Sequence, residues 1–149
     1  MERHGTDLAV NKRATFEYAI EERLQAGIEL TGHETKSAKM GRIDLSGARI
    51  AVDKGSAFAI GIAIPSFQPN NAPLGYDPHR TRRLLLTRAE IKTLMGKTQN
   101  GLTIVPLKAY TVRAHVKIEL GIGTWRKKED RRELLKKRET EREIRKFRK

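Results

Sequence analysis

The last 26 residues of the chain, positions 124–149, have a composition that keeps them out of a hydrophobic core. Thirteen of these residues are Lys or Arg, six are Asp or Glu, and none is Gly or Pro. At about 100° per residue, the apolar side chains of the segment do not share one helix face. Within residues 126–149 these side chains are Leu134, Leu135, Ile144 and Phe147. The folded body must therefore form from residues 1–123, and residues 124–149 are predicted to be a basic C-terminal tail.

Two segments of the body alternate in the way that β-strands do. In residues 57–64, large apolar side chains alternate with Ala and Gly, and the turn-forming residues 53–56 join this segment to residues 48–52. This pattern predicts a hairpin whose large side chains, from Phe58 onwards, face the core. Residues 114–122 alternate between apolar side chains and Lys, Glu or Gly, which predicts another strand.

The rest of the body is predicted to hold shorter elements and one long loop. Pro106 interrupts the strand expected at residues 102–110, which indicates an edge position or a bulge. Residues 1–9 are expected to be a loose terminus, and residues 65–83, with four of the five prolines, a long loop. The further strands are expected at residues 15–20, 27–30, 83–86 and 102–110.

Two helices are predicted from their N-terminal signals. A capping box, in which a Thr hydroxyl and a Glu carboxylate satisfy each other's backbone amides, occurs at Thr31 with Glu34 and at Thr87 with Glu90. The sum is a mainly β fold with short helices, of the α+β class. A small, partly closed antiparallel β-barrel of about six strands with two or three helices is the expected architecture.

The charge of the chain indicates an acidic partner. The formal net charge is +13 and the sequence pI is about 10.3, which favours nucleic acid over its rival, an anionic membrane surface. The longest apolar run, residues 57–65, is far shorter than the ~20 residues that span a bilayer. There is no cysteine and no apolar signal-peptide core near the N-terminus. We therefore expect a cytoplasmic protein without a membrane partner.

The sequence does not offer a catalytic or metal-binding constellation. The four histidines, His4, His33, His79 and His115, are scattered singly, and no Walker loop, dinucleotide-binding glycine motif or nucleophile elbow occurs. We expect no catalytic residue, no metal and no cofactor. A nuclease or RNA-modifying enzyme remains as an alternative that metal-dependent turnover would support.

As a helix, the tail would be stabilised only by weak local pairs such as Glu133 with Lys137, worth ~0.2–0.5 kcal/mol each. We expect the tail to be disordered in the free protein and helical against a polyanion. The alternative is a solvated segment that only aids solubility. The net charge of +7 in the tail favours contact with nucleic acid.

Several motifs in order give the chain a family resemblance. Residues 77–86 match the pattern Asp-Pro-x-Arg-x-Arg-Lys-Leu-Leu-Leu, with Arg83 in place of the Lys. The chain resembles the SsrA-binding protein family (small protein B, or SmpB), the partner of tmRNA in bacterial trans-translation, over about residues 11–132. The other matching segments are residues 11–14, 27–42, 96–97, 102–110 and 116–121.

The resemblance implies an oligonucleotide-binding (OB)-like barrel, at residues 1–123, that holds the tRNA-like domain of tmRNA. It implies that the tail, residues 124–149, enters the empty mRNA channel of a stalled ribosome and becomes a helix there. The partners would be tmRNA and the ribosome, including 16S rRNA at the decoding centre, and the protein would bind as a monomer. The alternative function is a basic ribosomal protein or an initiation-factor-like OB-fold protein that binds rRNA.

The resemblance implies RNA-binding residues at the positions of this chain that match the motifs of the family. Some candidates have a structural role as the alternative to RNA contact. Glu34 could only cap its helix, and Leu85 could be a core residue. Tyr18 could stack on a base, or it could be a half-buried strand residue. Lys117, on the polar face of its strand, is expected to be exposed whether or not it binds RNA. The RNA-binding candidates implied by the resemblance are Asn11, Lys12, Arg13, Glu34, Lys36, Leu85 and Lys117. On charge grounds we add Arg80, Arg82 and Arg83.

The tail candidates include positions where the chain departs from the family pattern. The family has Gly-Lys-Lys at the positions of Trp125, Arg126 and Lys127, and a His or Tyr at the position of Glu129. In the body, Gln25 stands where the family often has an acidic residue. The His or Tyr of the family is suited to stacking on a base in the decoding centre, which Glu129 cannot do. Trp125 is a candidate for that stacking here. The residues expected to contact the ribosome are Trp125, Arg126, Lys127, Lys128, Asp130, Arg131, Arg132, Lys136, Lys137 and Arg138.

Overall fold

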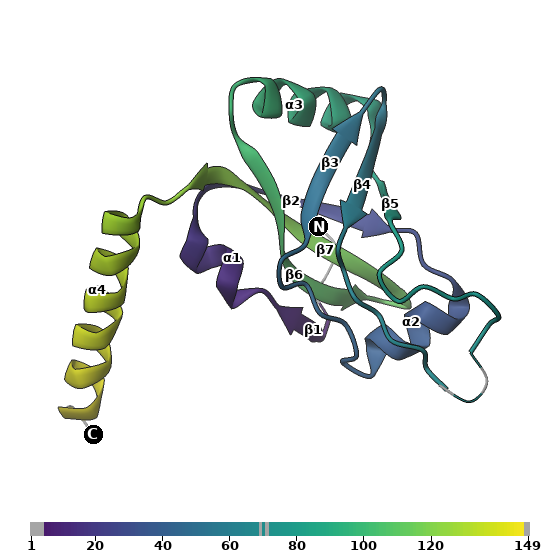
Figure 1. Cartoon of the computed structure of the whole chain (residues 1–149), viewed down its shortest axis with the longest axis horizontal. Coiled ribbons are helices and arrows are strands. Elements are labelled where there is room, and N and C mark those ends of the chain that lie inside the picture. The colour runs from purple at the N-terminus through teal and green to yellow at the C-terminus, as the bar shows by residue number, and fades with distance from the viewer. Residues whose placement is uncertain (1–4, 69, 71, 148–149) are drawn as a thin grey trace.

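The computed structural model describes residues 5–68, 70 and 72–147, and within them it forms seven strands and four α-helices (Figure 1). The α+β class with a dominant antiparallel sheet is confirmed. The prediction was about six strands and two or three helices, against the seven and four in the described residues. The strands are β1 (Asp7–Val10), β2 (Tyr18–Ile28), β3 (Arg49–Asp53), β4 (Ser56–Ile60), β5 (Arg82–Leu85), β6 (Thr103–Val112) and β7 (His115–Trp125). The helices are α1 (Lys12–Glu17), α2 (Gly32–Lys39), α3 (Arg88–Gln99) and α4 (Lys128–Phe147).

All seven strands belong to one sheet in the order β1-β6-β7-β2-β5-β4-β3, and every pairing is antiparallel. The long strands β2, β6 and β7 form its middle. Among the described residues no ladder joins the edge strands β1 and β3, so the sheet is open. It curls enough for β3 to lie against β6. Closure into a barrel stays a prediction.

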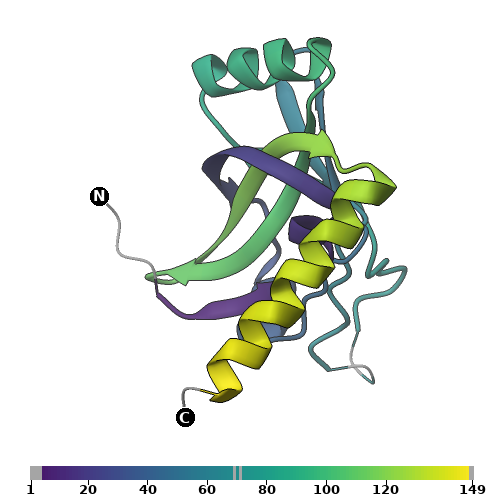
Figure 2. The same cartoon turned by 90° about the vertical axis from the view of Figure 1, so that its left-hand side faces the viewer.

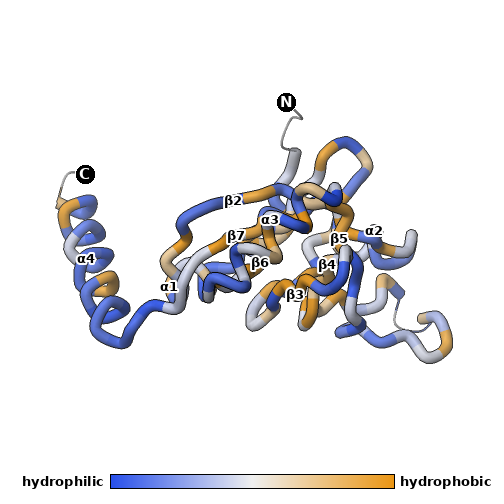
Figure 3. The backbone as a smooth tube through the Cα atoms, turned by 90° about the horizontal axis from the view of Figure 1, so that it is seen from above, coloured by the Kyte–Doolittle hydropathy of each residue, from blue (hydrophilic) through white to orange (hydrophobic). Residues whose placement is uncertain are grey.

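The main core lies inside this curl, where the apolar faces of the strands meet α3. Ile118 and Leu120 of β7 and Leu94 of α3 are fully buried there. A smaller cluster lies under α1, where Ala14 packs with Leu107 of β6. Figure 3 shows the contrast between these apolar strands and α4, which is mostly hydrophilic. No residue of α4 is buried.

The prediction of a strand at residues 15–20 is wrong for its first half, because α1 extends through Glu17. Asn11 caps this helix: its side-chain oxygen accepts a hydrogen bond from the Ala14 amide at 3.1 Å. The strand begins only at Tyr18. The loose terminus is also wrong in part, because residues 7–10 pair with β6. The residues before Gly5 lie outside the described ones.

The hairpin of β3 and β4 is confirmed, but the face that its large residues take is wrong for the first half of the pattern. Ala57 and Ala59 are buried, whereas Phe58 is half-buried. Gly61, at φ +88°, interrupts the pleat with a left-handed conformation that favours glycine. Beyond it the alternation changes phase, and Ile62 becomes fully buried.

Both predicted capping boxes and the irregularity at Pro106 are confirmed. The hydroxyls of Thr31 and Thr87 accept from the amides of Glu34 and Glu90, and both carboxylates accept from the Thr amides. Pro106 lies at a register shift between β6 and β7, so it occupies a bulge in an interior strand. Local chemistry therefore sets the starts of α2 and α3.

Candidate nucleic-acid interface

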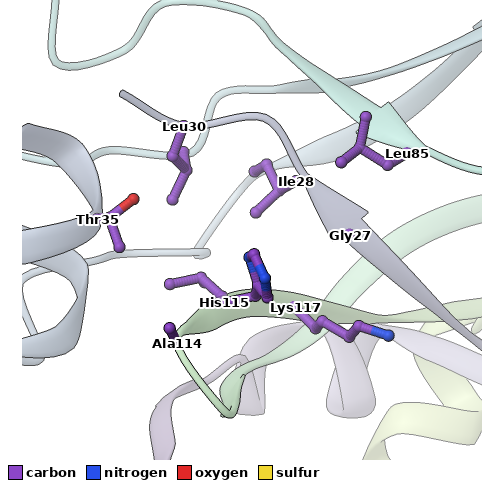
Figure 4. Close-up of a pocket in the computed structure, with 9 residues that line it drawn as sticks. Gly27, Ile28, Leu30, Thr35, Leu85, Ala114, His115 and Lys117 are labelled. Atoms are coloured by element: carbon purple, nitrogen blue, oxygen red, sulfur yellow. The ribbon is translucent and has the colours of Figure 1, made fainter. Parts of the chain in front are cut away.

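A groove of about 300 Å³ opens where the end of β2 meets β5, the β6–β7 turn and α2. Figure 4 shows its walls, with Leu85 on one side and Lys117 on the other. Leu85 is 56% exposed, so its interpretation as a core residue is wrong. The lining residues are Gly27, Ile28, Leu30, Thr35, Leu85, Ala114, His115, Val116 and Lys117.

The groove is built across three strands, with Gly27 in the centre. Gly27 of β2 is the register partner of Leu85 in β5 and of Lys117 in β7. Directly opposed residues in a sheet project from the same face, so all three positions face the groove. A Cβ atom at Gly27 would lie 3.3 Å from the Leu85 Cβ atom. The missing side chain therefore leaves space between an apolar wall and a half-buried lysine.

Beside the groove, a buried ionic network joins α2 to the long loop. The Glu34 carboxylate accepts hydrogen bonds from Arg82 Nε at 2.9 Å and from Arg80 Nε at 3.0 Å, and the Tyr76 hydroxyl donates to it at 3.3 Å. Glu34 and Arg82 are fully buried. Arg82 also donates to the carbonyls of Ile62 and Pro78 at 2.7 and 3.0 Å. The network thus fixes the loop that leads into β5.

The network holds Glu34 ionised. Burial by itself raises the pKa of this carboxyl. The hydrogen bonds from Arg80, from the Thr31 amide and from Arg82 outweigh burial and lower the pKa to about 2. The hydrogen bonds that Arg80 donates to Glu34 also raise the pKa of Arg80. Burial and the charge of Glu34 raise the pKa of Tyr76. At neutral pH Glu34 is therefore ionised, and it pairs with the guanidinium groups of Arg80 and Arg82.

The arginines predicted together on charge grounds separate in the structure. In β5, Arg82 faces inward, and Arg83 and Leu85 face outward. Arg80 pairs with Glu34 but keeps about a third of its side chain exposed. Lys36 of α2 is exposed, 6.0 Å from the Phe67 ring. Among the candidates near the groove, Arg82 and Glu34 thus have no surface for a ligand.

A second group of candidates lies at the other end of β2, around α1, away from the groove (Figure 1). Asn11 is buried, and its amide donates to the carbonyls of Leu45 and Pro106 at 3.1 and 2.8 Å. Lys12 is exposed. Arg13 is also exposed and donates to Glu17 at 2.6 Å. The structure therefore does not bring residues 11–13 together with Leu85 and Lys117.

The tail candidates lie at the end of β7, on α4 and on the connection between them. Figures 1 and 2 show α4 outside the sheet, on the side of α1. Trp125, 51% exposed, ends β7 opposite Tyr18, whose half-buried strand position is confirmed. Arg126 and Lys127 form the connection, and the remaining tail candidates all fall within the helix. Residues 148–149 lie outside the described ones.

Of the nine residues that line the groove, only Leu85 and Lys117 were predicted from the sequence. Gly27, Thr35 and His115 are among the seven that were missed. His115 lies two positions before Lys117 in β7, so the period of two places both on one face. That alternation could have indicated His115. Thr35 could not be found this way, because α2 reaches the groove only through the tertiary fold.

Within the described residues no group of three or more His, Asp or Glu side chains could hold a metal ion. The same part of the chain has no helix that is long and apolar enough to cross a membrane.

The groove, the exposed cations around it and the cationic helix α4 define a small RNA-binding protein. The family model described as SmpB protein matches residues 8–149. The chain belongs to this family, whose curated members are named SsrA-binding proteins.

Two relatives illustrate the match. The SsrA-binding protein of Geobacillus kaustophilus is 44% identical over 141 residues, which cover 94% of this chain and 90% of the relative. That of Gloeothece citriformis is 43% identical over 135 residues, covering 90% and 87%. A chain from a solved structure described as tmRNA-SmpB and the bacterial ribosome is 34% identical, with a TM-score of 0.67. The match covers 85% of this chain and 93% of that one.

Proposed function

We propose that this protein binds the tRNA-like domain of tmRNA and delivers it to stalled ribosomes for trans-translation, acting in the cytoplasm as an adaptor without catalysis of its own. The observation that carries the proposal is the groove, in which Gly27 brings Leu85 and Lys117 together in a family of SsrA-binding proteins. The names of the relatives favour tmRNA over the alternative of a ribosomal protein or initiation-factor-like protein that binds rRNA alone.

The groove suits a structured RNA because it pairs a cation with an apolar wall. Lys117 would contact a phosphate, and Leu85 would pack against a sugar or an unpaired base. Lys36, Arg80 and Arg83 would add contacts to the backbone around it. We propose that the curled sheet acts as the OB-like barrel of the family, and the approach of β3 to β6 supports this.

The buried candidates have a different part in this proposal. Glu34 and Arg82 would position the long loop that carries Arg80 and leads into β5, and Asn11 would position α1. None of the three residues offers an exposed surface to RNA. Lys12 and Arg13 lie on the side of the tail and would contact RNA there rather than at the groove.

The tail would then leave the body and lie as a helix in the empty mRNA channel, with its arginines and lysines on rRNA phosphates. Disorder of the free tail stays a prediction.

Replacing Lys117 or Leu85 by alanine is expected to weaken binding of the tRNA-like domain about tenfold, since each removes one groove contact. Lys117→Ala should also reduce the slope of log affinity against log salt by about one, whereas Leu85→Ala should leave it unchanged. Fluorescence-anisotropy titrations at several salt concentrations measure both. Lys92→Ala on the exposed face of α3 is the matched control.

The same titration against an unrelated structured RNA of equal length tests the function itself. Equal affinity of the unaltered protein for both RNAs would contradict recognition of tmRNA. A loss with Lys92→Ala as large as that with Lys117→Ala would contradict the groove as the binding site.

A further inference from the structure

The first half of α4 has a face that no apolar pattern reveals. Arg131, Leu134 and Arg138 are spaced i, i+3 and i+7, which places them on one side of the helix. Arg131 and Leu134 are half-buried, although their neighbours along the helix are exposed. This side therefore contacts the body, beside α1.

The surface that it meets is aromatic. It consists of Phe16, Tyr18 and Trp125, which we call the aromatic surface. The ring centroids of Tyr18 and Trp125 are 5.1 Å apart in an edge-on arrangement. The guanidinium of Arg131 lies 5.1 Å from the Trp125 centroid, and that of Arg138 lies 5.9 Å from the Phe16 centroid. Both distances are within the range of cation–π attraction.

The connection between sheet and helix is tied to the same place. The Arg126 amide donates to the Glu17 carbonyl at 2.7 Å, and Trp125 is held in the sheet opposite Tyr18. Among the described residues, the Nε atoms of Arg126 and Arg131 are buried without a hydrogen-bond partner. For Arg131 this fits a guanidinium that stacks on a ring rather than pairs with a carboxylate.

We propose that the aromatic surface holds residues 131–138 of the tail helix in the free protein, and that this contact competes with RNA for the tail. Residues 139–147 are all exposed, so we expect only this distal part to fray. The free tail would then be disordered only in this distal part, and not over its whole length as the sequence predicts. The docking depends on the contacts above, and only its competition with RNA rests on the proposed function.

The contact is weak enough to be displaced. At the strength typical of exposed sites, two cation–π contacts together favour the docked state by roughly fivefold to thirtyfold. The arginines of the tail would be free to contact phosphates once the helix leaves the aromatic surface. The apparent affinity for RNA would therefore equal the affinity of the undocked protein multiplied by the fraction of protein that is undocked.

Hydrogen exchange of the free, full-length protein tests the docking. Arg131→Gln with Arg138→Gln should lower the protection of amides 132–138 by roughly fivefold to thirtyfold. The control, Arg132→Gln with Lys136→Gln, removes the same charge from the far side of the helix and should leave that protection nearly unchanged. Equal protection in both double variants would overturn the docking. Neither measurement involves tmRNA, so failure here is distinct from failure of the proposed function.

A change on the body tests the competition without altering the tail. Phe16→Leu removes one aromatic partner and should tighten binding of an unstructured RNA oligonucleotide by about twofold to fivefold. Thermal unfolding within a few degrees of the unaltered protein checks that the fold is kept. Unchanged or weaker binding would overturn the competition.

Discussion

Ending the chain after Lys127 is expected to leave binding of the tRNA-like domain within about threefold and to lower tagging on stalled ribosomes by at least about 100-fold. The cut removes α4, which contributes no buried residue to the body. It keeps β7 whole, including the pairing of Trp125 with Tyr18, which an earlier cut after Gly123 would remove. The groove lies at the opposite end of β2 and loses nothing. Affinity titrations and a tagging assay with purified stalled ribosomes measure the two effects.

A shuffled tail separates the order of the residues from their charge. It has the composition of residues 128–149 in another order, and it should not restore tagging. Restoration would mean that charge alone suffices, and that α4 needs no defined arrangement of arginines. If the cut after Lys127 abolished binding of the isolated tRNA-like domain as well, the division of work between groove and tail would be wrong.

Elements defined by local chemistry could be predicted from the sequence. The turn between β3 and β4 and both capping boxes depend on residues within four positions of each other. Helix α1 could not be predicted, because Thr15 and Phe16 favour strands and the helix has only six residues. Its cap, Asn11, is held by carbonyls at Leu45 and Pro106, far away in the chain.

The site was predictable only in part for the same reason. Leu85 and Lys117 meet through the register of three strands, and no local pattern reveals that register. Charge alone could not distinguish the buried Arg82 from the exposed Arg83. In the tail, the lack of an apolar stripe could not reveal the face of α4 on which Arg131 and Arg138 lie over aromatic rings.

Replacing Glu34 by glutamine is expected to lower the free energy of unfolding by ~3–5 kcal/mol, because it leaves Arg82 buried without its counter-charge. For a domain of this size the loss lowers Tm by roughly 10 °C. Binding of the tRNA-like domain should weaken as well, since the loop that carries Arg80 and leads into β5 loses its anchor. Thermal unfolding and RNA titration measure the two effects.

Glu90→Gln is the matched control, because Glu90 closes the same kind of capping box at Thr87. Glutamine can keep a capping box, so this change should cost less than ~1 kcal/mol. An equal loss in the two variants would mean that Glu34 acts only as a cap and that its ion pair with Arg82 contributes little.

The stability of the unaltered protein should also depend on pH through Glu34. Its pKa is about 2 in the folded protein, against an ordinary value of 4.5, so folding favours the ionised form. The stabilisation, ~3 kcal/mol from this difference, is fully present above pH 4.5 and is lost as the pH falls from 4.5 towards 2. Denaturant unfolding across this range should show the loss in the unaltered protein and a smaller one in Glu34→Gln. Parallel pH profiles for the two proteins would contradict an ionised Glu34 as the group that holds the loop.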